Sequence, residues 1–189
     1  MNVEMTNLSF VILATLVILA IYTIKGIVMI IPAPALYIAV GALFPTPFAI
    51  IITYLGMTAA LSVAYILGKK LGEKKINLLI NKQERVSSFL RTNQDNLLTL
   101  CFLSRVLPLP KELFSLFYGS IGMKYPVYLI VSLLGMTPFM IPNVVAGASI
   151  HTPLSPEFLI PFGISLGITI VVFVIYTIHT KKMQGLIAY

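Results

Sequence analysis

Four long stretches of this 189-residue chain contain no charged residue, and they limit the possible folds more than any other feature. They are residues 5–24, 26–68, 125–156 and 158–180. A membrane-spanning helix needs about 20 predominantly apolar residues. Only 10% of the residues are charged, whereas about a quarter are charged in a typical soluble domain. The sequence therefore predicts one all-α, polytopic membrane domain.

Four segments are long enough and continuous enough to cross a bilayer as helices. The predicted transmembrane helices are residues 8–25, 47–68, 125–148 and 157–180. Residues 71–92 differ, because lysines and an arginine lie mostly opposite one apolar face. The apolar face comprises Ile76, Leu79, Ile80, Val86 and Leu90. This pattern is typical of an amphipathic helix that lies at the membrane interface and binds anionic lipid headgroups.

Two further apolar segments are too broken to cross as helices. Prolines interrupt residues 27–44 and residues 97–120. The predicted breaks are Pro32, Pro34, Pro108 and Pro110. Each proline removes a backbone donor and clashes with the preceding turn. Helical pieces of five to ten residues reach only about a quarter to a half of a roughly 30 Å hydrocarbon core. We therefore expect two re-entrant hairpins.

Arg105, Lys111 and Glu112 flank the prolines of the second hairpin. Each charge at bilayer depth costs roughly 2.5–3.5 kcal/mol, so such a segment persists where it is buried in protein or lines a wet cavity. A guanidinium holds a phosphate bidentately and keeps its charge, and Lys111 would add a second positive charge. The helix after Pro110 presents free N–H groups and the positive end of its dipole.

We therefore expect Arg105 and Lys111 to hold a lipid phosphate, with Glu112 pairing with one of them when no lipid is bound. Two plainer alternatives remain. Arg105 could extend to the cytoplasmic face and bind headgroups there. Lys111 and Glu112 could form a local ion pair with no role in substrate binding.

The chain contains an internal repeat. Leu-Gly-Met-Thr occurs at residues 55–58 and again 79 residues later, at 134–137. Further matches at an offset of 78 or 79 are Pro32 with Pro110, Gly41 with Gly119, Pro47 with Pro126 and Gly68 with Gly147. Each half thus reads as a broken hairpin followed by a span. Hairpins that enter from opposite sides make the repeat inverted, which is typical of transporters. Glycines expected to permit close helix packing are Gly41, Gly56, Gly119, Gly135 and Gly147.

The distribution of Lys and Arg predicts the orientation. If the N-terminus is cytoplasmic and neither hairpin crosses, Lys25 faces outside and Arg105 and Lys111 lie in the hairpin, so ten of the thirteen basic residues are cytoplasmic. The net charge of +7 then reflects loops that face an anionic membrane rather than nucleic acid binding. We expect a cell membrane protein with both termini cytoplasmic, which could form a homo-oligomer.

These motifs together resemble the DedA family, also called the VTT or SNARE-associated Golgi protein family. The resemblance covers roughly residues 25–147. It rests on the Pro-x-Pro of the first hairpin, on Gly-Ala-Leu-Phe at 41–44 and on Gly-Lys-Lys-Leu-Gly at 68–72. It rests most of all on Arg105, Pro108 and Lys111, which are similar to the family's Arg-x-x-Pro-x-x-Arg pattern with lysine in the last position.

The resemblance implies two opposed re-entrant hairpins and lipid translocation. Bacterial members are implicated in recycling undecaprenyl phosphate, and eukaryotic relatives in phospholipid scrambling. Family members carry acidic residues around the first hairpin that are thought to support proton coupling, but residues 26–68 contain none here.

The favoured function is therefore a flippase-like or scramblase-like transporter of a phosphate-bearing lipid. Alternatives are a transporter of a small anion or solute and a membrane assembly factor without transport activity. An enzyme is the least expected class, because no nucleophile–base pair, nucleotide-binding loop or metal-ligand spacing is visible. His151 and His179 are isolated, and the single Cys101 excludes an intramolecular disulfide. No cofactor or metal is expected.

Overall fold

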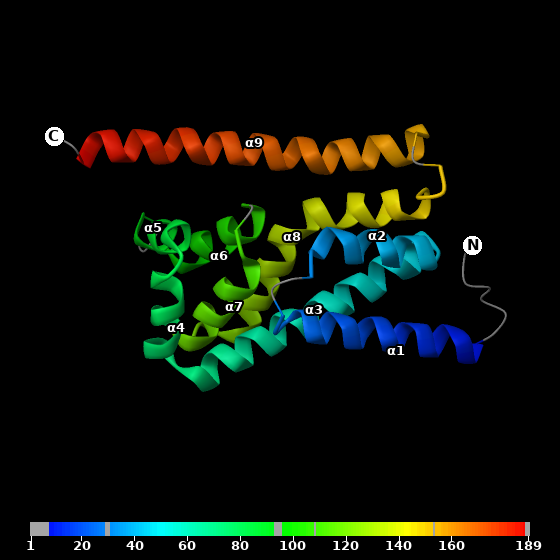
Figure 1. The fold of residues 1–189 in the computed structure, drawn as a ribbon, viewed down its shortest axis with the longest axis horizontal. Helices are drawn as coiled ribbons and strands as arrows, with labels where there is room; N and C mark the ends of the chain where they lie inside the picture. The colour runs from blue at the N-terminus through cyan, green and yellow to red at the C-terminus, as the bar shows by residue number, and fades with distance from the viewer. Residues whose placement is uncertain (1–7, 29–30, 93–95, 108, 153, 188–189) are drawn as a thin grey trace.

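The computed structural model describes residues 8–28, 31–92, 96–107, 109–152 and 154–187, and every element within them is a helix (Figure 1). The helices are α1 (Leu8–Lys25), α2 (Ala33–Leu43), α3 (Thr46–Leu71), α4 (Glu73–Asn81), α5 (Glu84–Thr92), α6 (Leu97–Val106), α7 (Lys111–Ser120), α8 (Tyr125–Ala148) and α9 (Pro156–Ile187). Viewed along the short axis, α1, α2, α3, α8 and α9 run roughly along the long axis of the molecule, and α4 to α7 gather near one end.

The outer surface of α1, α3, α8 and α9 is largely apolar. Among the described residues, α3 and α8 are long and apolar enough to cross a membrane. Large apolar side chains are exposed along α1, α3, α8 and α9, including Leu13, Leu16, Ile51, Leu55, Ile130, Leu134, Ile164 and Ile170. A soluble monomer rarely exposes a contiguous apolar patch above a few hundred Å². The surface therefore suits hydrocarbon rather than water.

The first predicted hairpin has a different path from the one expected. Among residues 27–28 and 31–44, which the structure describes, the helix is α2, and the segment expected as the first arm begins with the turn that ends α1. The turn follows Gly26, whose N–H bonds to the carbonyl oxygens of Tyr22 and Thr23 at 3.1 Å each. Pro32 caps α2, and Pro34 lies in its first turn. Although α1 and α2 follow each other in the chain, α2 packs mainly against α8 and also contacts α3, whereas α1 packs against α3.

The second hairpin segment contains two short helices, α6 and α7, inside residues 97–120. Asn96 caps α6, since its Oδ1 accepts hydrogen bonds from the N–H groups of Leu98 at 3.0 Å and Thr99 at 3.1 Å. Pro110 is the N-cap of α7. Pro108, which was predicted as a break, lies outside the described residues. The chain thus reverses between 107 and 110, where the prolines disfavour a continuous helix.

The single amphipathic helix predicted over residues 71–92 is wrong, because the structure has two helices, α4 and α5. The polar run 81–84 supplies no apolar side chain to hold a continuous helix against the protein. Breaking there lets both helices bury apolar side chains: Ile76, Ile80, Val86, Phe89 and Leu90. Phe89 meets Phe114 of α7 edge-on, with ring centroids 5.4 Å apart. Leu79, expected on the buried face, is 42% exposed.

Two pairs of helices cross in backbone contact, and the pairs correspond to each other. Gly41 of α2 faces the carbonyl of Val144 of α8, and Gly119 of α7 faces the carbonyl of Tyr65 of α3. Conversely, Gly147 faces the carbonyl of Ile38, and Gly68 faces that of Leu116. A Cβ at any of these four glycines would overlap the facing oxygen. The contacts of α2 with α8 therefore correspond to those of α7 with α3, and the corresponding residues differ by the 78 or 79 positions of the sequence repeat.

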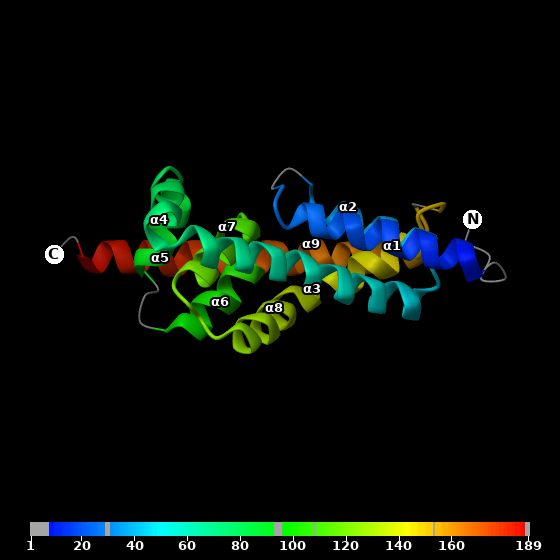
Figure 2. The same cartoon turned by 90° about the horizontal axis from the view of Figure 1, so that it is seen from below.

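The two helix crossings lie toward opposite ends of the molecule. The hydroxyl of Tyr65 donates to the carbonyl of Met123, which brings the loop before α8 to the end of α3 that carries Lys69 and Lys70. At the other end, Thr46, Ser149 and Pro156 lie around one cavity. The start of α1 and the end of α9 lie at opposite ends of the long axis (Figures 1 and 2).

Candidate functional site

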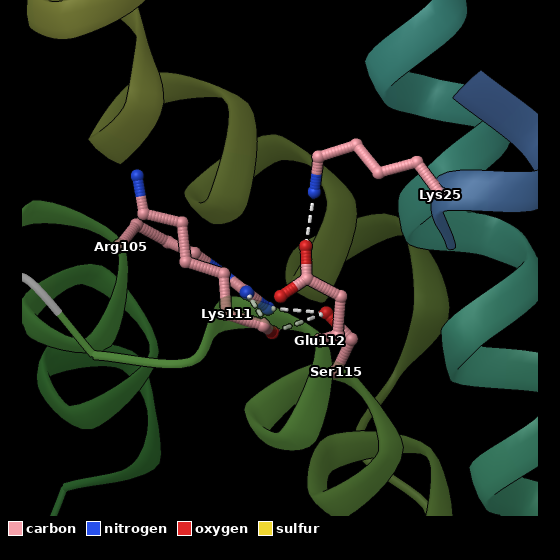
Figure 3. A network of polar contacts seen from close by, with 5 residues as sticks. All are labelled: Lys25, Arg105, Lys111, Glu112 and Ser115. Atoms are coloured by element: carbon pink, nitrogen blue, oxygen red, sulfur yellow. Dashed lines mark hydrogen bonds and ion pairs between the residues drawn. The ribbon is translucent and has the colours of Figure 1, made fainter. Parts of the chain in front are cut away.

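The turn after α1 and the turn before α7 meet at a buried ion pair. Nζ of Lys25 pairs with Oε1 of Glu112, as Figure 3 shows. Lys25 is only 3% exposed and Glu112 only 15% exposed. Two expectations are thereby corrected. Lys25 does not face the outside, because the first helix ends inside the protein, and Glu112 pairs with Lys25 rather than with Arg105 or Lys111.

Arg105 is completely buried at the end of α6 and binds three polar groups. Its Nε donates to Oγ of Ser132 at 3.1 Å, and its Nη2 donates to Oγ of Ser115 at 3.0 Å. Its Nη1 donates to the carbonyl oxygen of Lys111 at 2.7 Å. The guanidinium therefore joins α6, α7 and α8 around the chain reversal. The alternative in which Arg105 extends to the cytoplasmic face is wrong, since 0% of the residue is exposed.

Two tyrosine rings complete the surroundings of this charge. The guanidinium carbon lies 5.8 Å from the ring centroid of Tyr118 and 5.5 Å from that of Tyr128. Their hydroxyls are anchored, because Tyr118 donates to Oγ of Ser104 at 3.2 Å and Tyr128 donates to the carbonyl of Leu61 at 3.1 Å. Ring faces attract cations, most strongly where water is excluded. Arg105 thus keeps its charge buried with hydroxyls, a carbonyl and ring faces as hydrogen-bonding and cation–π partners.

Lys111 begins α7 and presents its ammonium to a ring instead of a carboxylate. Its Nζ lies 5.5 Å from the ring centroid of Phe139. Its carbonyl oxygen accepts from both Arg105 and Ser115, the latter at 2.9 Å. The backbone of Lys111 is therefore fixed while its charged end has no carboxylate partner among the described residues.

The buried cluster has an excess of two positive charges. Its cations are Lys25, Arg105 and Lys111, and Glu112 is its carboxylate. Residues 8–71 and 97–148, which form the surrounding helices, contain no other Asp or Glu. Burying charge without compensation is costly, so this arrangement favours binding of an anion.

In this conformation the cluster is closed. A cavity of about 10 Å³ lies beside the ion pair, lined by Gly26, Ala60, Leu61, Lys111, Glu112, Ser115 and Met136. A space of that size accommodates about one water molecule. A phosphate group therefore requires the turns to separate, and the Lys25–Glu112 pair is the ionic contact that would have to break.

The remaining predicted glycines lie against side chains. Gly135 of α8 faces Cβ of Arg105, and Gly56 of α3 faces the ring of Tyr22. A methyl group at either position would sit closer to these atoms than side chains normally do. Gly135 therefore leaves room for α6 to bring Arg105 to Ser132.

Sequence reasoning missed Lys25, Ser115 and Ser132 as members of the cluster. Lys25 had a usable signal, since it ends the helix before the first proline break just as Arg105 nearly ends the helix before the second. The two serines had none, because nothing distinguishes them from other serines of the chain. Within the described residues, no cluster of three or more His, Cys, Asp or Glu could hold a metal ion.

The helices, their exposed apolar faces and the buried charges define an all-helical membrane protein. The family model of the VTT domain matches residues 31–149, which is more than half of the chain. The chain therefore belongs to the VTT domain family, also known as the DedA or SNARE-associated Golgi protein family. Searches of curated proteins and of solved structures find no match.

Proposed function

We propose that this protein moves a phosphate-bearing lipid, such as a phospholipid or undecaprenyl phosphate, across the cell membrane. The observation that carries the proposal is the buried cluster of three cations and one carboxylate at the point where both chain reversals meet. Moving a lipid phosphate through hydrocarbon is opposed by its desolvation. A fixed excess of positive charge inside the protein lowers that cost.

In this proposal the two halves form an inverted repeat. The α1–α2 and α6–α7 pairs are two re-entrant hairpins that enter from opposite sides, and α3 and α8 are the spans that follow them. The exchanged glycine contacts support this, because a two-fold relation between halves produces reciprocal contacts of this kind. Transporters with inverted repeats bind substrate where the repeats meet, near the middle of the bilayer.

Lys25 and Lys111 are the proposed phosphate-binding groups. Arg105 already directs Nε, Nη1 and Nη2 to protein oxygens, so we assign it a positioning role: it holds the backbone of Lys111 and adds positive potential. In the closed conformation, the carboxylate of Glu112 forms an ion pair with the ammonium group of Lys25. An arriving phosphate competes with this carboxylate for Lys25, and release follows when Glu112 re-forms the pair.

The basic residues favour one orientation of the protein. Lys69, Lys70 and Lys124 lie at the same end as α4 and α5, so the proposal places that end in the cytoplasm. The end of α9 then lies on the cytoplasmic side and the start of α1 on the opposite side. This replaces the expectation of two cytoplasmic termini, because α1 ends in the buried cluster instead of crossing alone.

Lipid translocation in proteoliposomes tests the proposal. We expect wild-type protein to move acyl-labelled fluorescent phospholipid from the inner to the outer leaflet, where dithionite quenches it. Lys111→Met should lower the rate of this movement at least ten-fold and leave the thermal stability of the protein unchanged. Lys111→Arg should retain activity because it keeps the charge. Lys124→Met is the matched control, since Lys124 is exposed at the loop before α8.

Separate arms distinguish the other classes of function. Vesicles loaded with radiolabelled phosphate test transport of a small anion. Release of the phosphate without movement of lipid would mean that the substrate is a soluble anion and not a lipid. Wild-type protein that moves neither, or Lys111→Met protein as active as wild type, would contradict the proposed site.

A further inference from the structure

Three buried hydroxyl groups near the cluster have no hydrogen-bond partner among the described residues. They are Oη of Tyr22 on α1, Oη of Tyr37 on α2 and Oγ1 of Thr53 on α3. Each residue is at most 1% exposed. Buried hydroxyls are normally hydrogen-bonded, and leaving one without a partner costs free energy. Three such groups on three neighbouring helices therefore point to a ligand or to a second conformation in which they are satisfied.

The three hydroxyls belong to helices that pack together, because α1 and α2 both contact α3. The hydroxyl of Tyr22 lies near that of Thr53 but outside hydrogen-bonding geometry. Tyr37 lies on α2, which packs against α3. Tyr22 also precedes Lys25 by three residues on α1, so both side chains project from the same face. Tyr22 thus lies on the face of α1 that carries Lys25, with Thr53 close to it on α3 and Tyr37 on the adjoining helix α2.

We propose that Tyr22, Tyr37 and Thr53 form a second subsite, which hydrogen-bonds the hydroxyl-bearing head substituent of a phosphodiester lipid. The inference rests on the proposed function and names its substrate class. Each hydroxyl both donates and accepts a hydrogen bond, as an alcohol such as glycerol does, and none of the three carries a charge. Lys25 and Lys111 hold the phosphate, and the head alcohol extends toward α1, α2 and α3. A lipid that ends in a bare phosphomonoester leaves this subsite unused.

Comparison of two lipids with the same charge tests this subsite. Phosphatidylglycerol and phosphatidylmethanol are both phosphodiesters with one negative charge, but only the first carries head hydroxyls. In proteoliposomes we expect wild type to move acyl-labelled phosphatidylglycerol faster than acyl-labelled phosphatidylmethanol. Tyr37→Phe, Tyr22→Phe and Thr53→Val should each lower that ratio of rates about three- to ten-fold, which corresponds to one lost hydrogen bond.

Stability separates this role from a structural one. Because these hydroxyls lack partners in the closed conformation, the three substitutions should leave the melting temperature in detergent unchanged or raised. Tyr65→Phe is the matched control, since it removes a hydroxyl that donates to the carbonyl of Met123. It should lower the melting temperature and leave the lipid ratio as in wild type.

A binding measurement keeps the inference independent of transport. Short-chain phosphatidylglycerol should raise the melting temperature of wild type more than short-chain phosphatidylmethanol does, and Tyr37→Phe should abolish the difference. If wild type shows this preference but moves neither lipid, the proposed function fails and the subsite stands. If wild type shows no preference in either assay, or the variants keep the wild-type ratio, the hydroxyls bind water only and the inference is overturned.

Discussion

At the scale of single residues, the buried charges depend on one another unequally. Glu112 is the counter-ion of Lys25, whereas Arg105 relies on hydroxyls, a carbonyl and two rings. Removing one member of a buried ion pair leaves the other charge uncompensated, and removing both often costs little. The Lys25–Glu112 pair should therefore show strong energetic coupling.

A double-mutant cycle measures that coupling. Glu112→Gln and Lys25→Met should each lower the free energy of unfolding in detergent by about 3 kcal/mol, because each leaves one buried charge without its partner. The double variant should lose less than the sum of the two single losses. Additive losses would mean that the pair contributes no more than a solvent-exposed one.

Replacing Arg105 with lysine is expected to destabilise the protein. Arg105→Lys keeps the positive charge but lacks the planar fork that reaches Ser132, Ser115 and the carbonyl of Lys111 together. We expect a loss of about 3 kcal/mol in the free energy of unfolding, since hydrogen bonds to charged groups contribute roughly 1.5–3 kcal/mol each. Lys70→Arg, at an exposed position, provides the comparison and should change nothing measurable. Equal stability of both variants would contradict the positioning role.

At the scale of elements, proline breaks were readable and helix partners were not. Pro110 and the charges around it predicted the reversal between α6 and α7, because prolines act through local backbone sterics. The packing of α2 against α8, and the entry of Lys25 into the cluster, depend on contacts between segments far apart in the chain. The break between α4 and α5 likewise results from packing on α7, which overrides a continuous helical pattern.

Reciprocal glycine substitutions test whether the two crossings are equivalent. Gly41→Ala and Gly119→Ala should each destabilise the protein by about 2–4 kcal/mol, because the added methyl overlaps the carbonyl oxygen of Val144 or Tyr65 and separates the helices. The two losses should be similar if the halves are related by a two-fold axis. Gly163→Ala on α9 meets nothing within 4 Å, so it should be neutral or stabilising by up to about 1 kcal/mol through helix propensity alone. Denaturation of all three variants in the same detergent gives the comparison.

At the scale of the whole molecule, the number of complete crossings decides where the ends of the chain lie. The sequence suggested four spans, and uncharged length alone could not reveal that α1 ends at a buried ion pair. In the proposed arrangement α1 and α2 form one hairpin, and α3, α8 and α9 are the crossing helices. Seventeen residues of α1 precede Lys25 and extend roughly 26 Å, which exceeds half of a hydrocarbon core of about 30 Å. In that arrangement the start of α1 reaches the membrane surface on the side opposite Lys124.

Single cysteines at three exposed positions distinguish three crossings from four. In a Cys101→Ser background, Ser9→Cys on α1 and Leu154→Cys, where Leu154 is 87% exposed, should both react with a membrane-impermeant maleimide added outside intact cells. Lys124→Cys should react only after the membrane is opened, because the proposed orientation places the basic end in the cytoplasm. If Ser9→Cys instead behaves like Lys124→Cys, α1 crosses the membrane completely, and the buried Lys25–Glu112 contact does not describe the protein in its membrane. If Leu154→Cys and Lys124→Cys react from the same side, α8 does not span, and the inverted arrangement of the two halves fails with it.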